Sequence, residues 1–235
     1  GKTEAYLAAI VFHCFFDRLR GKSAGATAWI RFPLRLLTLQ QMQRVADIIG
    51  MAELVRREQK DPRINGNNVD GFGVGYFVGK EATPNKIEPP TGSQKYNKMT
   101  DPNWSKAMDE NARQEWKKII RCPNCGSKSV RLDFDAESVR LIHRCTNKDC
   151  AFADGVIPVY VVDKEIYRYL PCVLVGTIDK LANLGNQRMM SLLFGNVEGR
   201  CEIHGYCNNG KCLQEGCTSD RIKGIIPNSI GGLTL

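Results

Sequence analysis

The sequence has no apolar run long enough to cross a lipid bilayer. Its longest apolar stretch, Ala5 to Phe16, is interrupted by His13 and is shorter than the roughly 20 residues that a membrane-spanning helix needs. No basic-then-apolar leader with a small-residue cleavage site opens the chain, so nothing in it favours secretion. Low-complexity tracts and internal repeats are also absent. We therefore expect a cytoplasmic protein with no membrane partner.

The composition is that of an ordinary globular protein. The 235 residues are 43% hydrophobic and 25% charged, which excludes a disordered tail, a collagen and a coiled coil. The length suits one large domain or two small ones. Lys and Arg number 33 against 25 Asp and Glu, giving a net charge of +8. This basic excess favours nucleic acid or another polyanion as the partner and says nothing about the fold.

Cysteine, by contrast, is abundant, with 10 residues. Because several of them form short paired spacings and no leader is present, metal ligands in a reducing compartment are favoured over a disulfide framework. The first cluster reads C-x2-C, a spacer of nineteen residues, then C-x4-C. The spacer alternates apolar and polar residues over 130–134 and 139–143, which predicts a hairpin joining the two pairs. Four thiolates make a closed, structural zinc site, with ligands Cys122, Cys125, Cys145 and Cys150.

A disulfide pair or free core thiols are the alternatives for this first cluster. His143 lies two residues before Cys145, and we expect it to be a half-exposed strand residue rather than a ligand.

The second cluster echoes the first. Its Cys-x2-His-Gly turn resembles the Cys-x2-Cys-Gly turn, and it also ends in C-x4-C. The predicted zinc ligands are Cys201, His204, Cys212 and Cys217. Cys207 is the rival of His204 for the remaining position, and a loop with one disulfide and a free thiol is the alternative to a metal site. Cys14 and Cys172 stand in apolar segments and are predicted to be inert core residues.

Hydrophobic periodicity predicts helices and strands in alternation. We expect a helix over 1–20 that is buried on most sides, a strand over 26–32, and a helix that starts at the capping box of Thr38 and Gln41 and is interrupted at Gly50. Further strands are expected over 72–79, 156–162 and 171–175, with helices over 104–120 and from Thr177 to Phe194. This order indicates an α/β fold.

The chain begins Gly1-Lys2-Thr3, which matches the end of the phosphate-binding loop G-x-x-x-x-G-K-[ST]. In that loop the lysine reaches the β- and γ-phosphates and the hydroxyl ligates Mg²⁺, at the start of a helix. The predicted helix begins here at once. Gly21-Lys22-Ser23 matches the same tripeptide, but a strand is expected to follow it, so we interpret it as a chance match.

Two further segments extend this match into a family resemblance. Residues 31–44, RFPLRLLTLQQMQR, are similar to motif Ia of superfamily 2 helicases, and residues 175–181, VGTIDKL, resemble a later motif of the same domain. The three motifs stand in the helicase order, and the resemblance covers roughly residues 1–80 and 156–195. With a zinc-bearing insertion and the segment LPCVLVGTIDKLA, the chain most resembles the DrmA-like helicases of DISARM phage defence.

The resemblance implies an α/β fold: a partial P-loop RecA-like domain with an inserted zinc ribbon and a second small zinc-binding cluster. The implied divisions are 1–80, the first part of the motor domain; 81–155, the insertion; 156–200, the motor domain continued; and 201–235, the second cluster and the lead-in to a Walker B strand. Implied cofactors are ATP, Mg²⁺ and two zinc ions, and the implied partners are single-stranded DNA and another subunit of a defence complex.

The resemblance also assigns residues. ATP is expected at Gly1, Lys2 and Thr3. The nucleic-acid strand is expected along Pro33, Arg35, Gln40, Arg44, Thr177, Asp179 and Lys180, where helix N-termini and basic side chains suit phosphodiesters. The ordinary alternatives are that the threonines only cap helices and the arginines are only solvated charges.

The sequence departs from the helicase pattern in lacking a DEAH-type Walker B box. Asp109-Glu110 is superficially similar, but we expect it in the middle of a helix on a polar face. No arginine finger or second RecA-like domain follows, so no catalytic residue is assigned, and the chain alone is expected not to hydrolyse ATP. Two alternatives remain. One is a non-enzymatic zinc-ribbon module that binds nucleic acid or protein. The other is a P-loop enzyme of another kind, which the helicase-like segments at 31–44 and 175–181 disfavour.

Overall fold

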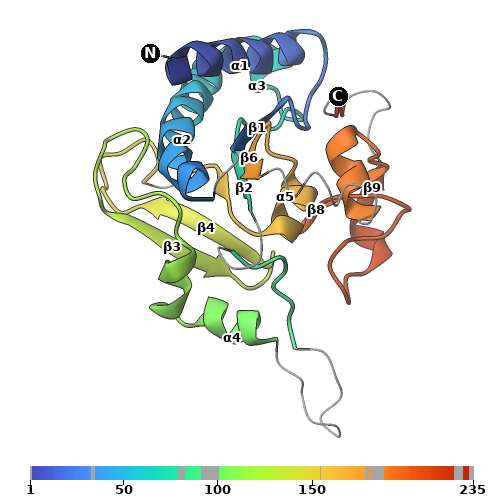
Figure 1. The fold of residues 1–235 in the computed structure, drawn as a ribbon. Coiled ribbons are helices and arrows are strands. Elements are labelled where there is room, and N and C mark those ends of the chain that lie inside the picture. The colour runs from blue at the N-terminus through green and yellow to red at the C-terminus, as the bar shows by residue number, and fades with distance from the viewer. Residues whose placement is uncertain are drawn as a thin grey trace, which may run out of the picture.

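A four-stranded parallel sheet organises the chain (Figure 1). The computed structural model describes residues 2–32, 35–78, 83–90, 101–153, 155–177, 180, 188–224 and 230–232. The strands are β1 (Ala28–Phe32), β2 (Val74–Phe77), β5 (Val159–Tyr160) and β6 (Val173–Thr177), in the order β1-β6-β2-β5. The sheet therefore combines strands from both sides of the cysteine-rich hairpin, and β6 separates the two strands that come first in the sequence.

Helices cover both faces of this sheet, as expected for parallel strands. Along β6, Val173 and Val175 pack in the cluster that includes α1 (Lys2–Leu19) and α2 (Arg35–Glu58), whereas Leu174 packs with α5 (Asp163–Tyr169). The short helix α3 (Pro62–Asn65) follows α2 and contacts α1. The alternation of β6 residues between two apolar clusters shows that the sheet is buried on both sides.

The predicted strand over 26–32 is confirmed as β1, and the helix over 1–20 is confirmed as α1. The expectation that this helix is buried on most sides is wrong. Phe12 is 63% exposed, and Phe16, Leu19 and Tyr6 are also exposed. Only one stripe of the helix, including Leu7 and Cys14, reaches the core. Within the described ranges, no helix combines the length and the apolar character that crossing a membrane requires.

Helix α2 differs from the sequence prediction both in where it begins and in its continuity at Gly50. It begins at Arg35, so Thr38 lies inside it rather than at its cap, and it continues through Gly50 without a break. A Cβ at Gly50 would lie 2.7 Å from Cβ of Pro123, in the first cysteine turn. The glycine is therefore a packing position, at which the helix lies against a turn that comes some seventy residues later.

The insertion holds a broken helix and a hairpin. Helix α4 (Pro102–Met108) and the 3-10 turn η1 (Ala112–Trp116) replace the predicted continuous helix over 104–120. Asp109 accepts hydrogen bonds from the backbone N–H of Asn111 and Ala112, both 2.9 Å, and this local capping competes with the helical pattern. Asp109-Glu110 therefore lies in a turn, not in mid-helix. The predicted hairpin is confirmed as antiparallel β3 (Val130–Asp135) and β4 (Arg140–Cys145).

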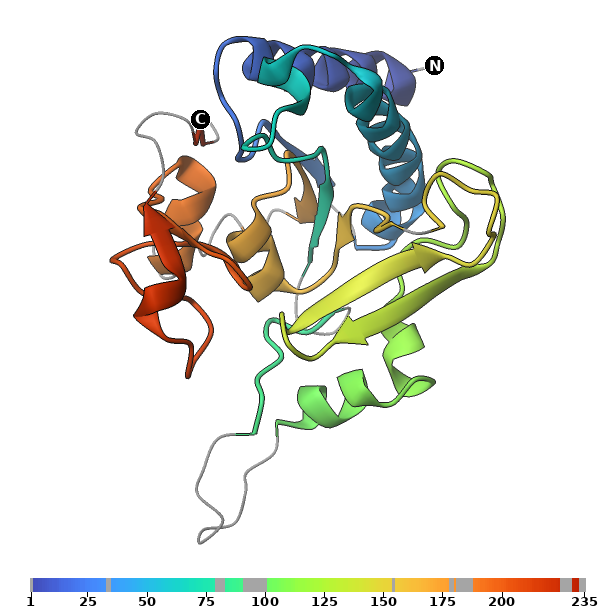
Figure 2. The ribbon, with the colours of Figure 1, turned by 180° about the vertical axis from the view of Figure 1, so that it is seen from behind.

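The C-terminal part forms a small unit beside the sheet (Figure 2). It contains the 3-10 helix η3 (Arg188–Phe194), the turn η4 (Ser219–Arg221) and a sheet of β7 (Gly199–Cys201), β8 (Gly205–Cys207) and β9 (Ile222–Gly224), in the order β8-β7-β9. Half of the helix predicted from Thr177 to Phe194 lies outside the described residues, and Thr177 itself ends β6. In the predicted lead-in to a Walker B strand, Ile230 forms a parallel bridge with Ala24, and 233–235 are outside the described residues.

Candidate functional site

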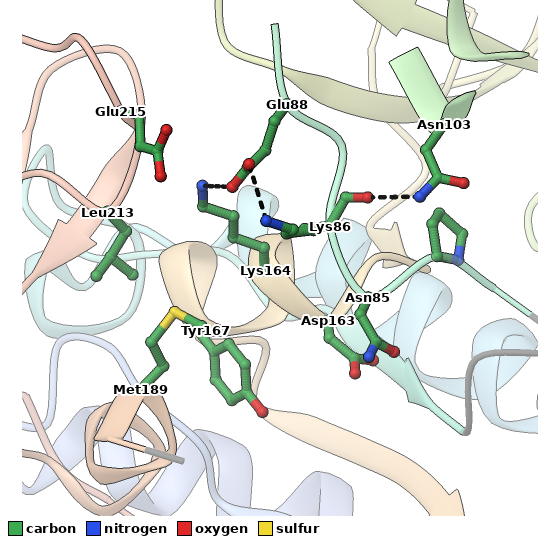
Figure 3. Close-up of a pocket in the computed structure, with 11 residues that line it drawn as sticks. Asn85, Lys86, Glu88, Asn103, Asp163, Lys164, Tyr167, Met189, Leu213 and Glu215 are labelled. Atoms are coloured by element: carbon green, nitrogen blue, oxygen red, sulfur yellow. Dashed lines mark hydrogen bonds and ion pairs between the residues drawn. The ribbon is translucent and has the colours of Figure 1, made fainter. Parts of the chain in front are cut away.

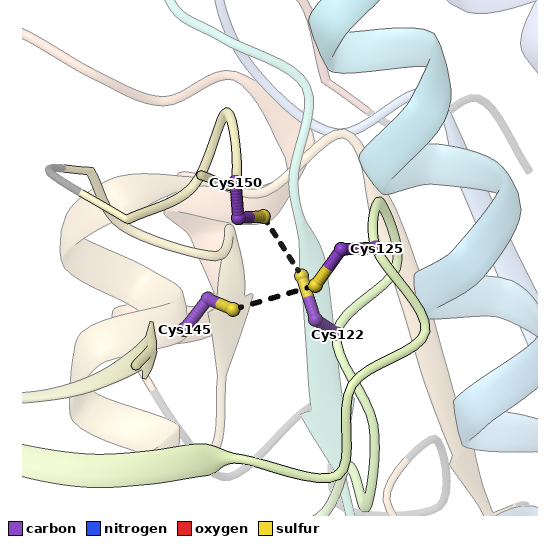
Figure 4. A group of neighbouring side chains, drawn as sticks. All are labelled: Cys122, Cys125, Cys145 and Cys150. Atoms are coloured by element: carbon purple, nitrogen blue, oxygen red, sulfur yellow. Dashed lines mark hydrogen bonds between the residues drawn. The ribbon is translucent and has the colours of Figure 1, made fainter. Parts of the chain in front are cut away.

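The first cysteine cluster joins the turn after η1 to the end of the hairpin. Cys122 and Cys125 lie on a tight turn in which Gly126 takes a positive φ of 69° and donates its N–H to the carbonyl oxygen of Cys122. Cys145 ends β4 and Cys150 follows it. The Sγ atoms of Cys122 and Cys150 are 3.5 Å apart, and those of Cys125 and Cys145 are 3.6 Å apart (Figure 4). All four sulfur atoms lie within 4.8 Å of one another.

This geometry fits a tetrahedral zinc ion. With Zn–S bonds of about 2.3 Å, neighbouring sulfur atoms are separated by about 3.8 Å. The observed separations lie near that value and far from the roughly 2.05 Å of a disulfide bond, and all ten cysteines are free. The backbone N–H of Ser127 lowers the pKa of Cys125 to about 7, which favours a thiolate. Since all four donors are thiols, the group suits a structural ion with no open position.

The second cluster forms at the β7–β8 turn. The Sγ of Cys201 lies 3.6 Å from Nδ1 of His204 and 3.7 Å from Sγ of Cys217. Cys212 completes the group, in which all ligand atoms lie within 4.8 Å of one another. Cys207, the rival candidate, is buried on β8 and is not part of the group. The structure therefore brings together the four residues predicted from the spacing that the two clusters share.

A hydrogen bond orients the histidine of this group. Nε2 of His204 lies 3.1 Å from the carbonyl oxygen of Glu137, at the tip of the β3–β4 hairpin. A carbonyl oxygen only accepts hydrogen bonds, so Nε2 carries the proton and the lone pair of Nδ1 faces the sulfur atoms. The second cluster is thereby tied to the hairpin that carries the first.

His143 does not occupy a half-exposed position, and that prediction is wrong. Its side chain is 0% exposed. Nδ1 lies 3.2 Å from the carbonyl oxygen of Val159 on β5, and the backbone N–H of Lys118 points to Nε2. Burial lowers the pKa of His143 to about 4. The neutral ring joins the hairpin to the parallel sheet and has no contact with the metal group.

The helicase-like segments meet at the carboxyl edge of the sheet. In the parallel pairing of β1 with β6, Phe32 is the register partner of Thr177. The chain leaves β1 toward Arg35 and leaves β6 toward Lys180 from neighbouring positions. The fold thus places the ends of two segments, separated by more than a hundred residues of sequence, next to each other. Carboxyl ends of parallel strands are where α/β sheets commonly bind their ligands.

The individual side chains at this edge differ in accessibility. Gln40 and Arg44 are exposed on α2, and Thr177 is 2% exposed. Nζ of Lys180 pairs with the carboxylate of Asp163 and lies 4.7 Å from the ring centre of Phe77. Lys180 is therefore anchored, not freely solvated. The remaining predicted positions lie outside the residues or side chains that the structure describes: Gly1, Lys2, Pro33, Arg35 and Asp179.

Thr3 is a partly buried residue in the first turn of α1. The second tripeptide match, Gly21-Lys22-Ser23, forms the turn that leaves α1, where Gly21 has a φ of 95°. Lys22 is engaged there by Asp17 and by the carbonyl oxygen of Ala26. No helix begins at this second match, which agrees with its interpretation as chance.

A cavity of about 590 Å³ has Asp163, the partner of Lys180, in its wall. Figure 3 shows this residue with the others that line the cavity. Glu88 on its wall accepts from Nζ of Lys86 at 2.9 Å and from Nζ of Lys164 at 3.1 Å. Burial raises the pKa of Asp163 to about 6 even though Lys180 opposes the shift. Sequence analysis missed this group, because its members come from a loop and a short helix with no motif spacing.

Comparison with known proteins finds a similarity to a protein of phage defence. The chain is 35% identical over 224 residues to the DISARM protein DrmA of Bacillus paralicheniformis, and the aligned region covers 90% of this chain. No protein-family model matches the chain. The chain spans 19% of the length of DrmA. The predicted resemblance to DrmA is thus confirmed: this chain is similar to about a fifth of a DISARM protein.

Proposed function

We propose that this chain is part of an ATP-dependent nucleic-acid helicase or translocase that acts in defence against phage. The observation that carries the proposal is the pairing of Phe32 with Thr177, which brings the two strand-contacting motifs to one edge of a parallel sheet. The similarity to DrmA supports the defence role. The proposed setting is the cytoplasm, with single-stranded DNA and another subunit of a defence complex as partners.

In this proposal, ATP binds at the N-terminus of α1. The helix starts at Lys2, directly after Gly1, and the first backbone N–H groups of a helix have no partner within it. Lys2 neutralises the β- and γ-phosphates, and the hydroxyl of Thr3 ligates Mg²⁺. ATP, when bound and hydrolysed by the whole protein, would supply the free energy for alternately closing and opening two lobes of the motor. No hydrolytic residue is assigned to this chain.

The strand is proposed to run along the carboxyl edge of β1 and β6. Arg44 is exposed and is proposed to neutralise a phosphate, and Gln40 lies exposed one turn before it on α2. The N-terminal turn of α2 offers further backbone donors, whereas Thr177 is buried. Lys180, held by Asp163, contributes its charge from a fixed position. These contacts involve the backbone of the strand, so binding is expected to be tolerant of base sequence.

The two zinc groups are proposed to be structural. The first cysteine turn packs on α2 through Gly50 and Pro123, and the second is tied to the hairpin through His204 and Glu137. Each ion would therefore fix a unit against the motor sheet rather than take part in chemistry. The competing function is a non-enzymatic zinc-ribbon module that binds nucleic acid or protein, supported by the net charge of +8 and the two metal groups.

The test is the ATPase activity of the whole protein with and without single-stranded DNA. Lys2→Ala should abolish ATP hydrolysis and leave the zinc content unchanged, because the lysine charge acts on phosphates. Lys60→Ala is the matched control, since Lys60 is exposed just after α2 and has no ion pair within the described residues. An unchanged rate in Lys2→Ala would exclude Gly1-Lys2-Thr3 as the nucleotide site and favour the zinc-ribbon module.

A further inference from the structure

A second cavity, of about 380 Å³, lies at the opposite edge of the sheet from the helicase-like segments. Phe72 and Gly73 precede β2, Pro158 precedes β5 and Pro171 precedes β6, and all four line it. The remaining walls come from the end of α2, from Arg140 on β4 and from strand β7. The cavity therefore forms where the parallel sheet, the hairpin and the C-terminal unit meet.

Four arginines and two carboxylates line this cavity. Glu53 accepts from Nε of Arg56 at 2.7 Å, from Nε of Arg57 at 2.8 Å and from the backbone N–H of Phe72 at 2.7 Å. Its charge is thus neutralised by two cations. Hydrogen bonds from these arginines hold the pKa of Glu53 below its usual value although burial opposes the shift.

The second carboxylate, Asp70, is also fully engaged. It accepts from Nη1 of Arg200 at 3.2 Å and from the hydroxyl of Tyr206 at 2.8 Å. Neither carboxylate is left to pair with the fourth arginine, and the wall carries two positive charges in excess.

Arg140 is that fourth arginine. Its guanidinium carbon lies 4.8 Å from the ring centre of Tyr160 and 4.6 Å from that of Tyr169. Among the described residues it has no hydrogen bond and no ion pair, and its Nε is buried without a partner. A guanidinium that stacks through its face directs its N–H donors outward in its own plane. Burial raises the pKa of both tyrosines, so they stay neutral. The carboxylates of Glu165 and Asp135 act on the charge of Arg140 through space and leave its N–H donors without a hydrogen-bond partner.

A buried Nε–H without a hydrogen-bond partner is costly, because its hydrogen bond to water is lost. An anion with several oxygens in the cavity would satisfy the donors of Arg140 and the excess charge together. Phosphate matches the fork of an arginine with two oxygens. Gly73 packs closely against the ring that stacks on Arg140, since a Cβ there would lie 3.0 Å from Cε2 of Tyr160.

We propose that this cavity is a phosphate-binding site, with Arg140 as the principal ligand and Arg57 and Arg200 as supporting cations. The phosphate belongs to a nucleotide or to a nucleic-acid backbone, which share this chemistry. The site lies at the amino edge of the sheet and is separate from the nucleotide site proposed at Lys2. It does not depend on the helicase function.

The experiment uses the whole protein carrying Lys2→Ala, so that phosphate does not bind at the proposed nucleotide site. Inorganic phosphate is titrated by calorimetry into this background and into the same background with Arg140→Gln. Arg140→Gln should weaken phosphate binding about tenfold or more, because a hydrogen-bonded charge is lost. Arg131→Gln is the matched control: Arg131 lies on the partner strand β3 with a side chain 50% exposed, and its removal should leave phosphate affinity unchanged.

Arg200→Gln tests the site independently if Arg140→Gln does not fold, because the Arg200 side chain is 47% exposed. Its loss should weaken phosphate binding several-fold. Binding of a thymidine oligonucleotide over a range of salt concentrations identifies the source of the phosphate. A salt slope reduced by about 0.7 in Arg140→Gln indicates a strand backbone, and an unchanged slope with lost phosphate affinity indicates a free nucleotide. The proposal is overturned if the Lys2→Ala background binds no phosphate, or if Arg140→Gln and Arg200→Gln both retain its affinity.

Discussion

Nε2 of His204 lies 3.1 Å from the carbonyl oxygen of Glu137, so the second metal group and the tip of the first hairpin share a hydrogen bond. A histidine held in this way presents a fixed Nδ1 to its three cysteines. The orientation of His204 depends on Glu137, 67 positions earlier in the chain. The spacing of neighbouring residues in the sequence does not predict such a contact.

The first prediction concerns metal content. His204→Ala should lower the zinc content of the whole protein by about one ion per chain and unfold the unit formed by β7, β8 and β9, because structural zinc binding is coupled to folding. Cys207→Ala is the control, since Cys207 lies outside the metal group, and it should keep the parent zinc content. Elemental analysis measures both. Loss of zinc in Cys207→Ala alone would reverse the assignment.

The second prediction concerns the contact between α2 and the first cysteine turn. Gly50→Ala should lower the free energy of unfolding by about 1–3 kcal/mol, because the new methyl group overlaps the rigid ring of Pro123. Gly224→Ala is the control, since no atom lies within 4 Å of a Cβ placed there. Urea unfolding of the two variants measures the difference. A stabilised Gly50→Ala, as helix propensity alone would give, would contradict the contact.

The third prediction concerns pH. Burial raises the pKa of Glu165 to about 7, from 4.5, so the folded state binds the proton more tightly than the unfolded chain. The contribution of Glu165 to stability is therefore fully present below about pH 4.5 and is lost as the pH rises through about 7. Glu165→Gln should remove a slope of up to about 1.4 kcal/mol per pH unit within this window.

Denaturant titrations of the parent and of Glu165→Gln between about pH 5 and pH 8 measure this slope. Glu110→Gln provides the control, because the side chain of Glu110 is 66% exposed and should leave the pH dependence as it is. Parallel curves for the parent and Glu165→Gln would show that the carboxyl group is ionised throughout.

The fourth prediction concerns the proposed strand-binding edge. Arg44→Ala should lower the log–log salt slope of single-stranded DNA binding by about 0.7, the value for one phosphate contact on a single strand. Fluorescence anisotropy of a labelled oligonucleotide measures the slope, with Lys60→Ala as the matched loss of one exposed charge. Equal salt slopes in Arg44→Ala and the parent would show that the strand does not contact Arg44 on α2.

Sequence analysis succeeded where the signal is local. Alternation between the two cysteine pairs predicted the β3–β4 hairpin, and the repeated C-x4-C gap predicted the second metal group. It failed where a distant contact decides the outcome. Helix α2 continues through Gly50, where the contact with Pro123 leaves no room for a side chain. His143 is buried because its hydrogen-bond partner, the carbonyl oxygen of Val159, belongs to the other sheet.

The cavity around Arg140 could not have been predicted for the same reason. Its walls come from segments spread between Glu53 and Arg200, and none of them carries a recognisable motif. Only the meeting of the three units creates the excess of positive charge. The end of helix α4 before Asp109 has a local cause, since Asp109 accepts hydrogen bonds from the backbone just after it. The periodic apolar residues of the same segment predicted a continuous helix and outweighed this capping signal.

The position of β6 between β1 and β2 sets an order for events on the ribosome. Strands β1 and β2 leave the exit tunnel first and do not pair with each other. Strand β1 pairs with β6, which begins at Val173, whereas β2 pairs with β6 and with the earlier strand β5. At 5–20 residues per second, the intervening segment takes about 5–20 s to be made. The cysteine hairpin, whose contacts are short in sequence, is complete within that interval. The nascent chain therefore has the cysteine hairpin in place before its central sheet closes, and β1 stays without its partner β6 during that delay.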